Sequence, residues 1–343
     1  MNSGRYARQV TLPGVGVDGQ ERLASARVLC VGAGGLGSPA ALYLTAAGIG
    51  TVGLIDGDVV MESNLPRQVL YDSNDLGRPK TQAAAAKLRL LNPQVKIVTH
   101  DHWLEPENAQ EVFRGYDVIV DGSDNFATKY LVNDAAAALG LPVVWGSISG
   151  HEGRVSVFCV GRGPCYRCVY PEPPSAPVGH CGENGVLGAL AGVIGAAQAL
   201  EAQKLCFKTD GVFRPLLGRM LVVDGATFET FVWEIQPNSQ CAHGSKGLRA
   251  VSRLEPGVMI VDVRPADEWR KAHVPGALSW PLEALERGKT PPLERSRPCV
   301  VYCQYGAQTW RAVELLEQQG FRDVRELLGG FTRWSHESSV AFG

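Results

Sequence analysis

The feature that most constrains the fold of this 343-residue chain is the glycine-rich segment Gly32-Ala33-Gly34-Gly35-Leu36-Gly37. An apolar run, residues 28–31, precedes it, and residues 38–44 follow it as a helix-forming stretch. Within that stretch we expect Ser38 to cap the helix and Pro39 to occupy its first turn. This order predicts a strand, a glycine turn and a helix, an arrangement in which backbone amides approach a phosphate closely. The glycines predicted to contact the nucleotide are Gly32, Gly34, Gly35 and Gly37.

A second apolar run, residues 51–55, ends at Asp56. That spacing places an acidic side chain where it meets a ribose hydroxyl in Rossmann-type folds. The fold class predicted for this part of the chain is therefore α/β, with a Rossmann-like, doubly wound sheet. At this point NAD and ATP fit equally well.

Charged residues further along the chain separate these two nucleotides. Adenylyl transfer has to stabilise the charge on a departing pyrophosphate, whereas hydride transfer does not. Arg67 and Lys80 could supply that charge. Asp124 follows the apolar run 116–120, so it would lie at a carboxyl end of the parallel sheet and could hold Mg²⁺. Taken singly, each of the three could instead be a solvated charge, a helix-start residue or a helix cap.

Taken together, four motifs resemble the MoeB/ThiF/HesA type of ubiquitin-like-protein activating family. They are Arg5-Tyr6-Ala7-Arg8-Gln9, Asn64-Leu65-Pro66-Arg67-Gln68, Arg78-Pro79-Lys80 and Asp121-Gly122-Ser123-Asp124-Asn125. The resemblance covers roughly the first 245 residues. It implies a homodimer that uses ATP and Mg²⁺ to adenylate the C-terminal Gly-Gly carboxylate of a ubiquitin-like protein.

The same resemblance implies roles for individual residues. Asp56 would hold the ribose, Asp124 the Mg²⁺ ion and the reacting phosphate, and Arg8 would reach in from the partner subunit. The residues implied to hold the phosphates are Asn64, Arg67 and Lys80. We also predict that Asp58, Gln68 and Asn125 contact the nucleotide.

Composition excludes several other classes of function. A net charge of −2 and a pI near 6.4 argue against a polycation that binds nucleic acid. The first six residues contain no apolar signal region, and the most apolar stretch, residues 186–197, is too short to span a bilayer. Nine cysteines without an export signal favour thiols or metal ligation over a disulfide framework. We therefore expect a cytoplasmic protein that binds neither a membrane nor nucleic acid.

Cys165 and Cys168 have the Cys-x-x-Cys spacing of two ligands to one tetrahedral Zn²⁺ ion. The family completes such a site with a second Cys-x-x-Cys, but here the matching region offers only Cys241 and His243. The alternatives are a Cys₃His zinc site and a site that has lost its zinc. The resemblance also implies that Cys181 lies in a loop where its thiol can attack or accept an acyl group.

A second α/β alternation begins after residue 247, and the apolar run 299–302 leads into Cys303 ahead of an amphipathic helix. A loop closing around such a sulfur can aim amide donors at it and so stabilise a thiolate or a persulfide. The segment resembles a rhodanese domain, which implies that Cys303 carries the sulfur. Gln308 stands where many rhodaneses have an arginine, which favours a protein persulfide donor such as a cysteine desulfurase over an anionic donor.

The combined hypothesis is an adenylation domain at 1–245 followed by a sulfurtransferase domain at 248–343. ATP activates the carboxylate of a sulfur carrier, the persulfide on Cys303 attacks the acyl-adenylate, and Cys181 releases a thiocarboxylate. The nearest alternative is an adenylyltransferase whose rhodanese domain only docks a partner. A more distant one is a nicotinamide oxidoreductase, which leaves Arg67, Lys80 and Cys303 without roles.

Overall fold

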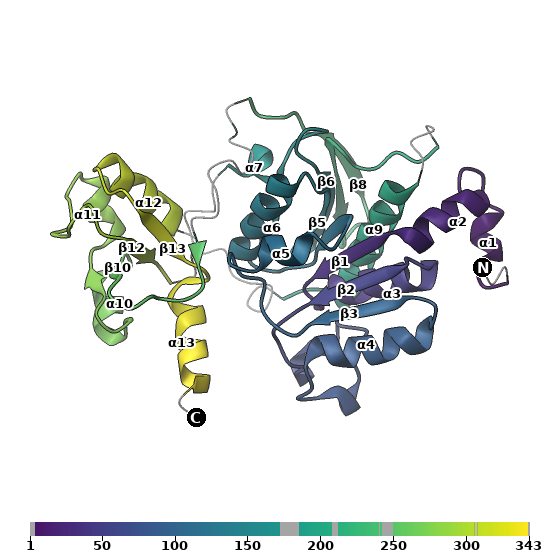
Figure 1. Ribbon diagram of the computed structural model, residues 1–343, viewed down its shortest axis with the longest axis horizontal. Helices are drawn as coiled ribbons and strands as arrows, with labels where there is room; N and C mark the ends of the chain where they lie inside the picture. Colours follow the sequence, from purple (N-terminus) through teal and green to yellow (C-terminus); the bar gives the residue numbers. More distant parts are fainter. Residues whose placement is uncertain are drawn as a thin grey trace. The chain divides into compact units, whose positions relative to one another are not determined.

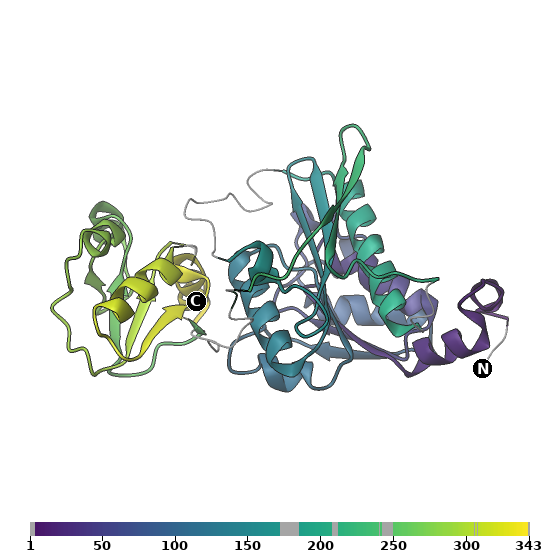
Figure 2. The same ribbon diagram turned by 90° about the horizontal axis from the view of Figure 1, so that it is seen from above.

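The computed structural model describes residues 4–171, 185–207, 212–239, 241, 250–304, 306 and 308–341. The chain divides into two compact units, each with its own sheet (Figure 1; Figure 2). The first unit comprises Met1–Leu104, Asn108–Val169 and Gly179–Ser245. The second comprises Glu105–Glu107, Tyr170–Val178 and Lys246–Gly343.

The first unit is built on an eight-stranded sheet in the order β3-β2-β1-β4-β5-β6-β7-β8. The strands from β3 to β5 run parallel, and β6, β7 and β8 continue the sheet antiparallel. Their bounds are β1 Arg27–Val31, β2 Thr51–Ile55, β3 Lys96–His100, β4 Val118–Asp121, β5 Val143–Ser149, β6 Glu152–Phe158, β7 Arg219–Asp224 and β8 Thr230–Glu234. The strand order reverses at β1, as a doubly wound sheet requires.

Helices cover both faces of this sheet. On one face α3 packs against both α4 and α9, and on the other α5 packs against α6. The helices of the unit are α1 Ala7–Val10, α2 Gly16–Ser25, α3 Gly37–Ala47, α4 Lys80–Leu91, α5 Ala109–Phe113, α6 Phe126–Leu139, α7 Tyr166–Val169 and α9 Gly188–Cys206, with short 3₁₀ helices η1 Glu62–Asn64 and η2 Ser73–Asp75. The predicted α/β fold class is confirmed.

Strand register brings the site-bearing residues to one edge of the sheet. Val31, the last residue of β1, pairs with Ile55 at the end of β2 and with Asp121 at the end of β4. All three strands run parallel, so the segments that follow them leave the sheet together. The glycine turn, Asp56 and the segment that carries Asp124 are therefore neighbours in space.

The second unit is a smaller parallel sheet in the order β11-β10-β12-β13-β9. Its strands are β9 Ala250–Val251, β10 Met259–Asp262, β11 Leu278–Ser279, β12 Cys299–Tyr302 and β13 Val324–Leu327. Its helices are α10 Ala266–Lys271, α11 Leu282–Glu286, α12 Thr309–Gln318 and α13 Gly330–Ala341. Alternate residues of β12 enter two apolar cores: Val301 packs with α12, while Tyr302 packs with Phe331 of α13.

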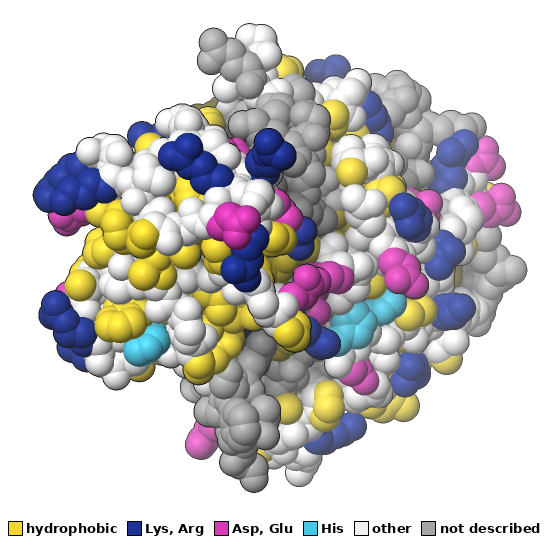
Figure 3. Space-filling model, turned by 60° about the vertical axis from the view of Figure 1, so that its left-hand side comes forward, with side chains coloured by type: hydrophobic (Ala, Val, Ile, Leu, Met, Phe, Trp, Pro, Cys, Tyr) yellow, Lys and Arg dark blue, Asp and Glu magenta, His cyan; other side chains and the backbone are white. Residues whose placement is uncertain are grey.

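Two surface properties complete the description. Among the helices within the described ranges, none is both long enough and apolar enough to cross a membrane. On the face drawn in Figure 3, basic and acidic side chains are interspersed, and neither sign of charge forms a continuous area.

Candidate active sites

Close packing of glycines shapes the turn between β1 and α3. Gly32 has a φ of +85°, in the left-handed region that glycine tolerates best. A Cβ atom at Gly37 would overlap the carbonyl oxygen of Gly32, and one at Gly122 would lie 3.0 Å from the backbone nitrogen of Gly37. Larger residues would therefore push the first turn of α3 away from the ends of β1 and β4. The first turn of a helix leaves amides without intrahelical partners, and such amides can bind an anion.

Hydrogen bonds to Asp56 stabilise this turn. The Asp56 carboxylate accepts a hydrogen bond from the amide of Ala33 at 2.8 Å and another from the amide of Asp58 at 2.8 Å. Burial raises the pKa of Asp56, and the nearby charge of Lys80 opposes that rise. Each carboxylate oxygen retains a further lone pair, so the predicted bond to a ribose hydroxyl is compatible with these two contacts.

A second set of hydrogen bonds, which the sequence did not predict, holds the same turn. The hydroxyl groups of Tyr71 and Ser38 both donate to the carbonyl oxygen of Ala33, at 2.8 and 3.1 Å. The prediction that Ser38 caps α3 is wrong: Leu36 occupies the cap position without a side-chain bond, and Ser38 lies inside the helix. Ser38 is completely buried, so its hydroxyl has to bond within the protein and takes the Ala33 carbonyl.

Arg67 and Gln68 lie over the glycine turn. A Cβ atom at Gly35 would be 3.6 Å from Cγ of Arg67, and one at Gly34 would be 3.6 Å from Nε2 of Gln68. The guanidinium of Arg67 also donates to the carbonyl of Ser63 at 2.7 Å. The tertiary fold thus brings together two of the motifs separated in sequence, with the Arg67 side chain beside the glycine turn.

Asn64 has a local structural role. It is almost completely buried, and its side-chain oxygen accepts a hydrogen bond from the amide of Met61 at 3.1 Å. That bond closes the short helix η1, which leads directly into Arg67. Its predicted contact with the phosphates stays a prediction.

Lys80 begins α4 with its side chain buried, and its ammonium group lies 2.8 Å from the carboxylate of Asp58. The segment before it is held by Asp75, which forms ion pairs with Arg78 at 2.7 Å and with Lys87. Burial alone would raise the pKa of Asp75, but the hydrogen bond from Lys87 and the other polar contacts lower it overall. Asp75 therefore stays ionised and anchors the chain that delivers Lys80.

Asp124 is exposed at the carboxyl edge of the sheet, just beyond β4. The cap of α6 is its neighbour Asn125, whose side-chain oxygen accepts a hydrogen bond from the amide of Thr128 at 2.8 Å. Since Asn125 supplies the cap, the carboxylate of Asp124 remains available for a hard cation, which prefers oxygen ligands. The exposed carboxylate of Asp124 and the half-exposed carboxylate of Asp58 offer oxygen ligands of the kind that Mg²⁺ prefers.

A buried ion pair between Lys129 and Asp121 lies beside the segment that carries Asp124. Lys129 of α6 lies 3.3 Å from the carboxylate of Asp121 and donates to the carbonyl of Gly146 at 2.9 Å. Asp121 also accepts bonds from the amide and the hydroxyl of Ser123. The pair ties β4, β5 and α6 together directly beneath Asp124. Neither Asp121 nor Lys129 was predicted as a site residue.

Arg8 lies at the opposite end of α3 from the glycine turn. It belongs to α1, whose Gln9 donates to the carbonyl of Ala47 at 3.1 Å, and Ala47 is the last residue of α3. The 11 residues of α3 span about 16 Å. Arg8 is exposed there and is separated from the carboxyl edge of its own subunit.

Three predicted metal ligands converge. The sulfur of Cys165 lies 3.8 Å from that of Cys168 and 3.6 Å from that of Cys241. A tetrahedral zinc ion with Zn–S bonds of about 2.3 Å holds its sulfurs about 3.8 Å apart, so this donor set fits zinc. Burial, followed by the neighbouring thiols, raises the pKa of Cys165 to about 12. The remaining predicted ligand, His243, lies outside the described residues, as does Cys181.

In the second unit, two backbone amides donate to the sulfur of Cys303. This residue is almost completely buried, and its sulfur accepts from the amides of Gly306 at 3.2 Å and Gln308 at 3.4 Å. The carbonyl of Cys303 accepts from the amide of Phe331 at 2.9 Å, and that of Gln304 from the amide of Thr332 at 3.0 Å. The start of α13 thus binds the loop carbonyls, while the loop amides point at the sulfur and would stabilise negative charge on it.

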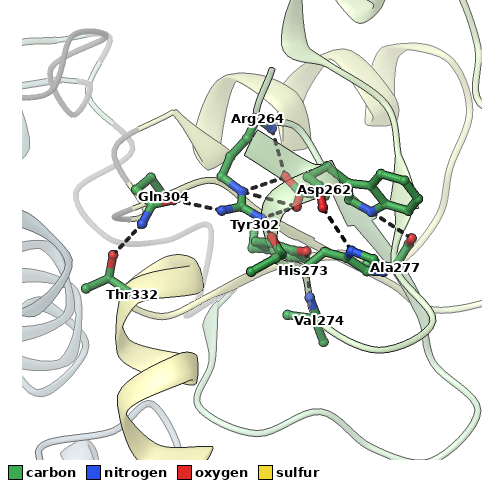
Figure 4. Close-up of polar contacts among 10 residues, drawn as sticks. Asp262, Arg264, His273, Val274, Ala277, Tyr302, Gln304 and Thr332 are labelled. Atoms are coloured by element: carbon green, nitrogen blue, oxygen red, sulfur yellow. Dashed lines mark hydrogen bonds and ion pairs between the residues drawn. The ribbon is translucent and has the colours of Figure 1, made fainter. Parts of the chain in front are cut away.

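Arg264, a cation bonded to this loop, is paired with an acid (Figure 4). Arg264 is buried and forms a charge-assisted hydrogen bond to Asp262 at 2.7 Å. It also donates to the side-chain oxygen of Gln304 at 2.8 Å, and Gln304 in turn donates to Thr332 at 2.9 Å. Arg264 therefore holds the residue after Cys303 in place, and amides are the donors to the sulfur.

Comparisons with known proteins decide the family. A model of the ThiF family matches residues 6–243, which is more than half of the sequence. The chain belongs to the ThiF family. A model of the rhodanese-like domain matches residues 249–337. A ThiF-family adenylation region is thus followed by a rhodanese-like domain, as predicted.

Named relatives combine the same two activities. The chain is 40% identical to the probable adenylyltransferase/sulfurtransferase MoeZ of Mycobacterium tuberculosis, with 97% of this chain and 93% of the relative covered. It is 36% identical to the adenylyltransferase and sulfurtransferase MOCS3-2 of Zea mays, with 98% and 80% covered. The predicted enzyme class, an ATP-binding adenylyltransferase and sulfurtransferase, is confirmed.

Solved structures support the fold. The ThiF-family region is similar to E. coli MccB crystallised with ATP, with a TM-score of 0.61, 20% identity, and coverage of 71% of this chain and 75% of that chain. At this level of identity the similarity establishes the doubly wound architecture alone.

Proposed function

We propose that this enzyme adenylates the C-terminal Gly-Gly carboxylate of a ubiquitin-like sulfur carrier protein and converts it to a thiocarboxylate in the cytoplasm. The observation that carries the proposal is that one chain holds both a glycine turn flanked by Arg67 and Lys80 and a cysteine whose sulfur accepts from two backbone amides. We assign adenylation to residues 1–245 and sulfur transfer to residues 248–343. The two compact units and the ranges matched by the two family models support that division.

In the first half-reaction, a carboxylate oxygen of the carrier attacks the α-phosphorus of ATP and pyrophosphate leaves. Asp56 orients the ribose, while Arg67 and Lys80 stabilise the charge that develops on the phosphates. Asp124 would hold Mg²⁺, which supplies neutralisation of the triphosphate. Asn64, Gln68 and Asn125 shape the segments around the turn and the edge and would contact the nucleotide.

We assign Arg8 to the active site of a partner subunit in a homodimer. Its place beside the end of α3 supports this assignment, because the helix separates it from the carboxyl edge of its own sheet. An arginine delivered from the other subunit would add positive charge only when both copies are assembled. Adenylation would then depend on dimer formation.

In the second half-reaction, a donor such as a cysteine desulfurase leaves a persulfide on Cys303. Its terminal sulfur attacks the acyl-adenylate carbonyl, and AMP leaves. The thiolate of Cys181 then attacks the Cys303 sulfur of the resulting acyl disulfide, releasing the thiocarboxylate and leaving a Cys181–Cys303 disulfide. A thiol reductant returns both residues to thiols. The amides of Gly306 and Gln308 would stabilise the sulfur anion on Cys303.

We also propose that Cys165, Cys168 and Cys241 hold a structural Zn²⁺ ion. The near-tetrahedral sulfur spacing supports this. Metal analysis of the purified chain and of Cys165→Ser would test it. About one zinc per chain in the wild type, and none in the variant, is expected.

The mass of the intact carrier tests the main proposal. A carrier ending in Gly-Gly is incubated with the enzyme, Mg-ATP and a persulfide donor. The expected product has gained the mass difference between sulfur and oxygen. A gain that survives in Cys303→Ala would identify the rhodanese domain as a docking module. An unmodified carrier, with no ATP–pyrophosphate exchange in its presence, would contradict the adenylation step.

A further inference from the structure

The buried lysine of the phosphate site is already paired with an acid. The ammonium group of Lys80 lies 2.8 Å from a carboxylate oxygen of Asp58. The Lys80 side chain is 6% exposed and the Asp58 side chain 44% exposed. The positive charge is therefore buried and balanced, while the negative charge of the pair faces solvent.

The backbone keeps Asp58 in this position. Its amide donates to Asp56 at 2.8 Å, and its carbonyl accepts from the amide of Lys80 at 2.9 Å. The adjacent residues Val59 and Pro79 form a β-bridge. The segment that carries Asp58 is thus bonded along its backbone to the segment that carries Lys80. We therefore expect the Asp58 carboxylate to stay beside Lys80 when a nucleotide binds to the turn.

We propose that Asp58 makes this site selective for magnesium-complexed nucleotides over free ones; this inference rests on the proposed adenylation. A free triphosphate gains little from a lysine whose charge is already balanced, and it is repelled by the nearby carboxylate. A nucleotide that brings its own divalent cation offers Asp58 an opposite charge. At the distances across a phosphate site, one such charge changes binding by about tenfold or more.

This selectivity serves the reaction that the site performs. Free ATP, AMP and inorganic phosphate are all anions that two cations at a helix N-terminus would otherwise attract. Because the charge of Lys80 is balanced by Asp58, the site binds each of these free anions more weakly. The magnesium complex of ATP carries less net negative charge, so the carboxylate repels it less. Asp58 therefore acts as a specificity-determining residue, in addition to its predicted contact with the nucleotide.

Calorimetric titration of the full chain with ATP tests the inference. Binding is measured with and without added Mg²⁺, in buffer treated with a chelating resin, because a soluble chelator would also strip metal from the cysteine cluster. The wild type is expected to prefer Mg-ATP strongly. In Asp58→Asn, binding of free ATP is expected to tighten about tenfold while binding of Mg-ATP does not tighten.

Two further variants make the result decisive. Asp72→Asn is the matched control, because Asp72 also lies 2.8 Å from a lysine, Lys87, and its side chain is also about half exposed. It should leave the preference unchanged. Asp58→Glu retains the charge and should retain most of the preference, provided that its melting temperature matches the wild type.

Three results would overturn the inference. Weaker binding of free ATP by Asp58→Asn would mean that Asp58 only positions Lys80 or binds the nucleotide. An unchanged preference would mean that its charge has no effect, and a preference lost in Asp58→Glu would assign the effect to geometry. Failure of the wild type to bind either form of ATP would instead contradict the proposed adenylation.

Discussion

The two units handle negative charge in different ways. The proposed phosphate-binding edge of the first unit uses charged side chains, Arg67 and Lys80, around a glycine turn. The loop of the second unit directs the amides of Gly306 and Gln308 at its sulfur, while Arg264, a cation bonded to this loop, is paired with Asp262. A triphosphate spreads several charges over many oxygens and calls for full positive charges beside it, whereas one sulfur needs a few oriented dipoles.

The largest expected effect is that of Cys303→Ala, which should abolish the activity of the second unit and leave that of the first unit unchanged. Replacing Cys303 by Ala removes the thiol that we propose holds the persulfide, so thiocarboxylate formation should fall by about a thousandfold or more. ATP–pyrophosphate exchange in the presence of the carrier should be unchanged. Cys299→Ala, four residues earlier in β12, is the matched control and should retain both activities. Loss of exchange in Cys303→Ala would show that the two units do not act independently.

The reciprocal substitution, Lys80→Ala, removes a charge from the phosphate site. We expect ATP–pyrophosphate exchange to fall on the order of 10²–10³-fold, because a fixed cation at a departing phosphate acts mainly in the transition state. Loading of Cys303 with persulfide, measured by mass, should not change. Lys96→Ala, at an exposed position at the start of β3, provides the control. Equal losses in both variants would assign the effect to net charge.

In our proposal the phosphate site also needs a second copy of the chain, and mixing experiments test this difference between the two units. Arg8→Ala and Asp124→Asn should each be nearly inactive in exchange. After the two are unfolded and refolded together, half of the dimers are mixed and each has one intact site. About a quarter of the wild-type activity should return. No recovery would place Arg8 outside the partner's active site.

A smaller effect is expected from a substitution at Gly306, which changes the direction of the amide that donates to the sulfur of Cys303. Gly306 has a φ of +84°, so Gly306→Ala strains the loop and should slow sulfur transfer about tenfold. Gly288 has a φ of +76° in the same unit and open space around it. Gly288→Ala should lower the melting temperature similarly without slowing transfer. A similar slowing of sulfur transfer in both variants would contradict a specific role for the Gly306 amide.

The smallest effect concerns the fastening of the glycine turn. Tyr71→Phe deletes the hydroxyl that bonds to Ala33 and should lower the free energy of unfolding by about 1 kcal/mol. The KM for ATP should rise a few-fold, while persulfide loading in the second unit stays constant. Tyr43→Phe, at an exposed position on α3, should change neither quantity. An unchanged KM in Tyr71→Phe would show that the turn holds its shape without this bond.

Much of the candidate site could be predicted because its signals are local. The glycine turn, Asp56 and Lys80 each stand at the end of a strand or the start of a helix, and such positions follow from short patterns of apolar residues. Cys303 was identifiable for the same reason. The Ser38 prediction failed because a capping preference is weak, and burial beside the Ala33 carbonyl outweighed it.

The sequence by itself determined the fold class and the position of each motif along the chain, because these depend on local periodicity and spacing. The resemblance of those motifs to a known family indicated the family. Only the tertiary structure decided that Tyr71 fastens the turn, that Lys129 pairs with Asp121, and that Asp58 balances Lys80. Each of these contacts joins residues on separate elements. Their geometry depends on strand register and helix packing, which set which buried polar groups must find one another.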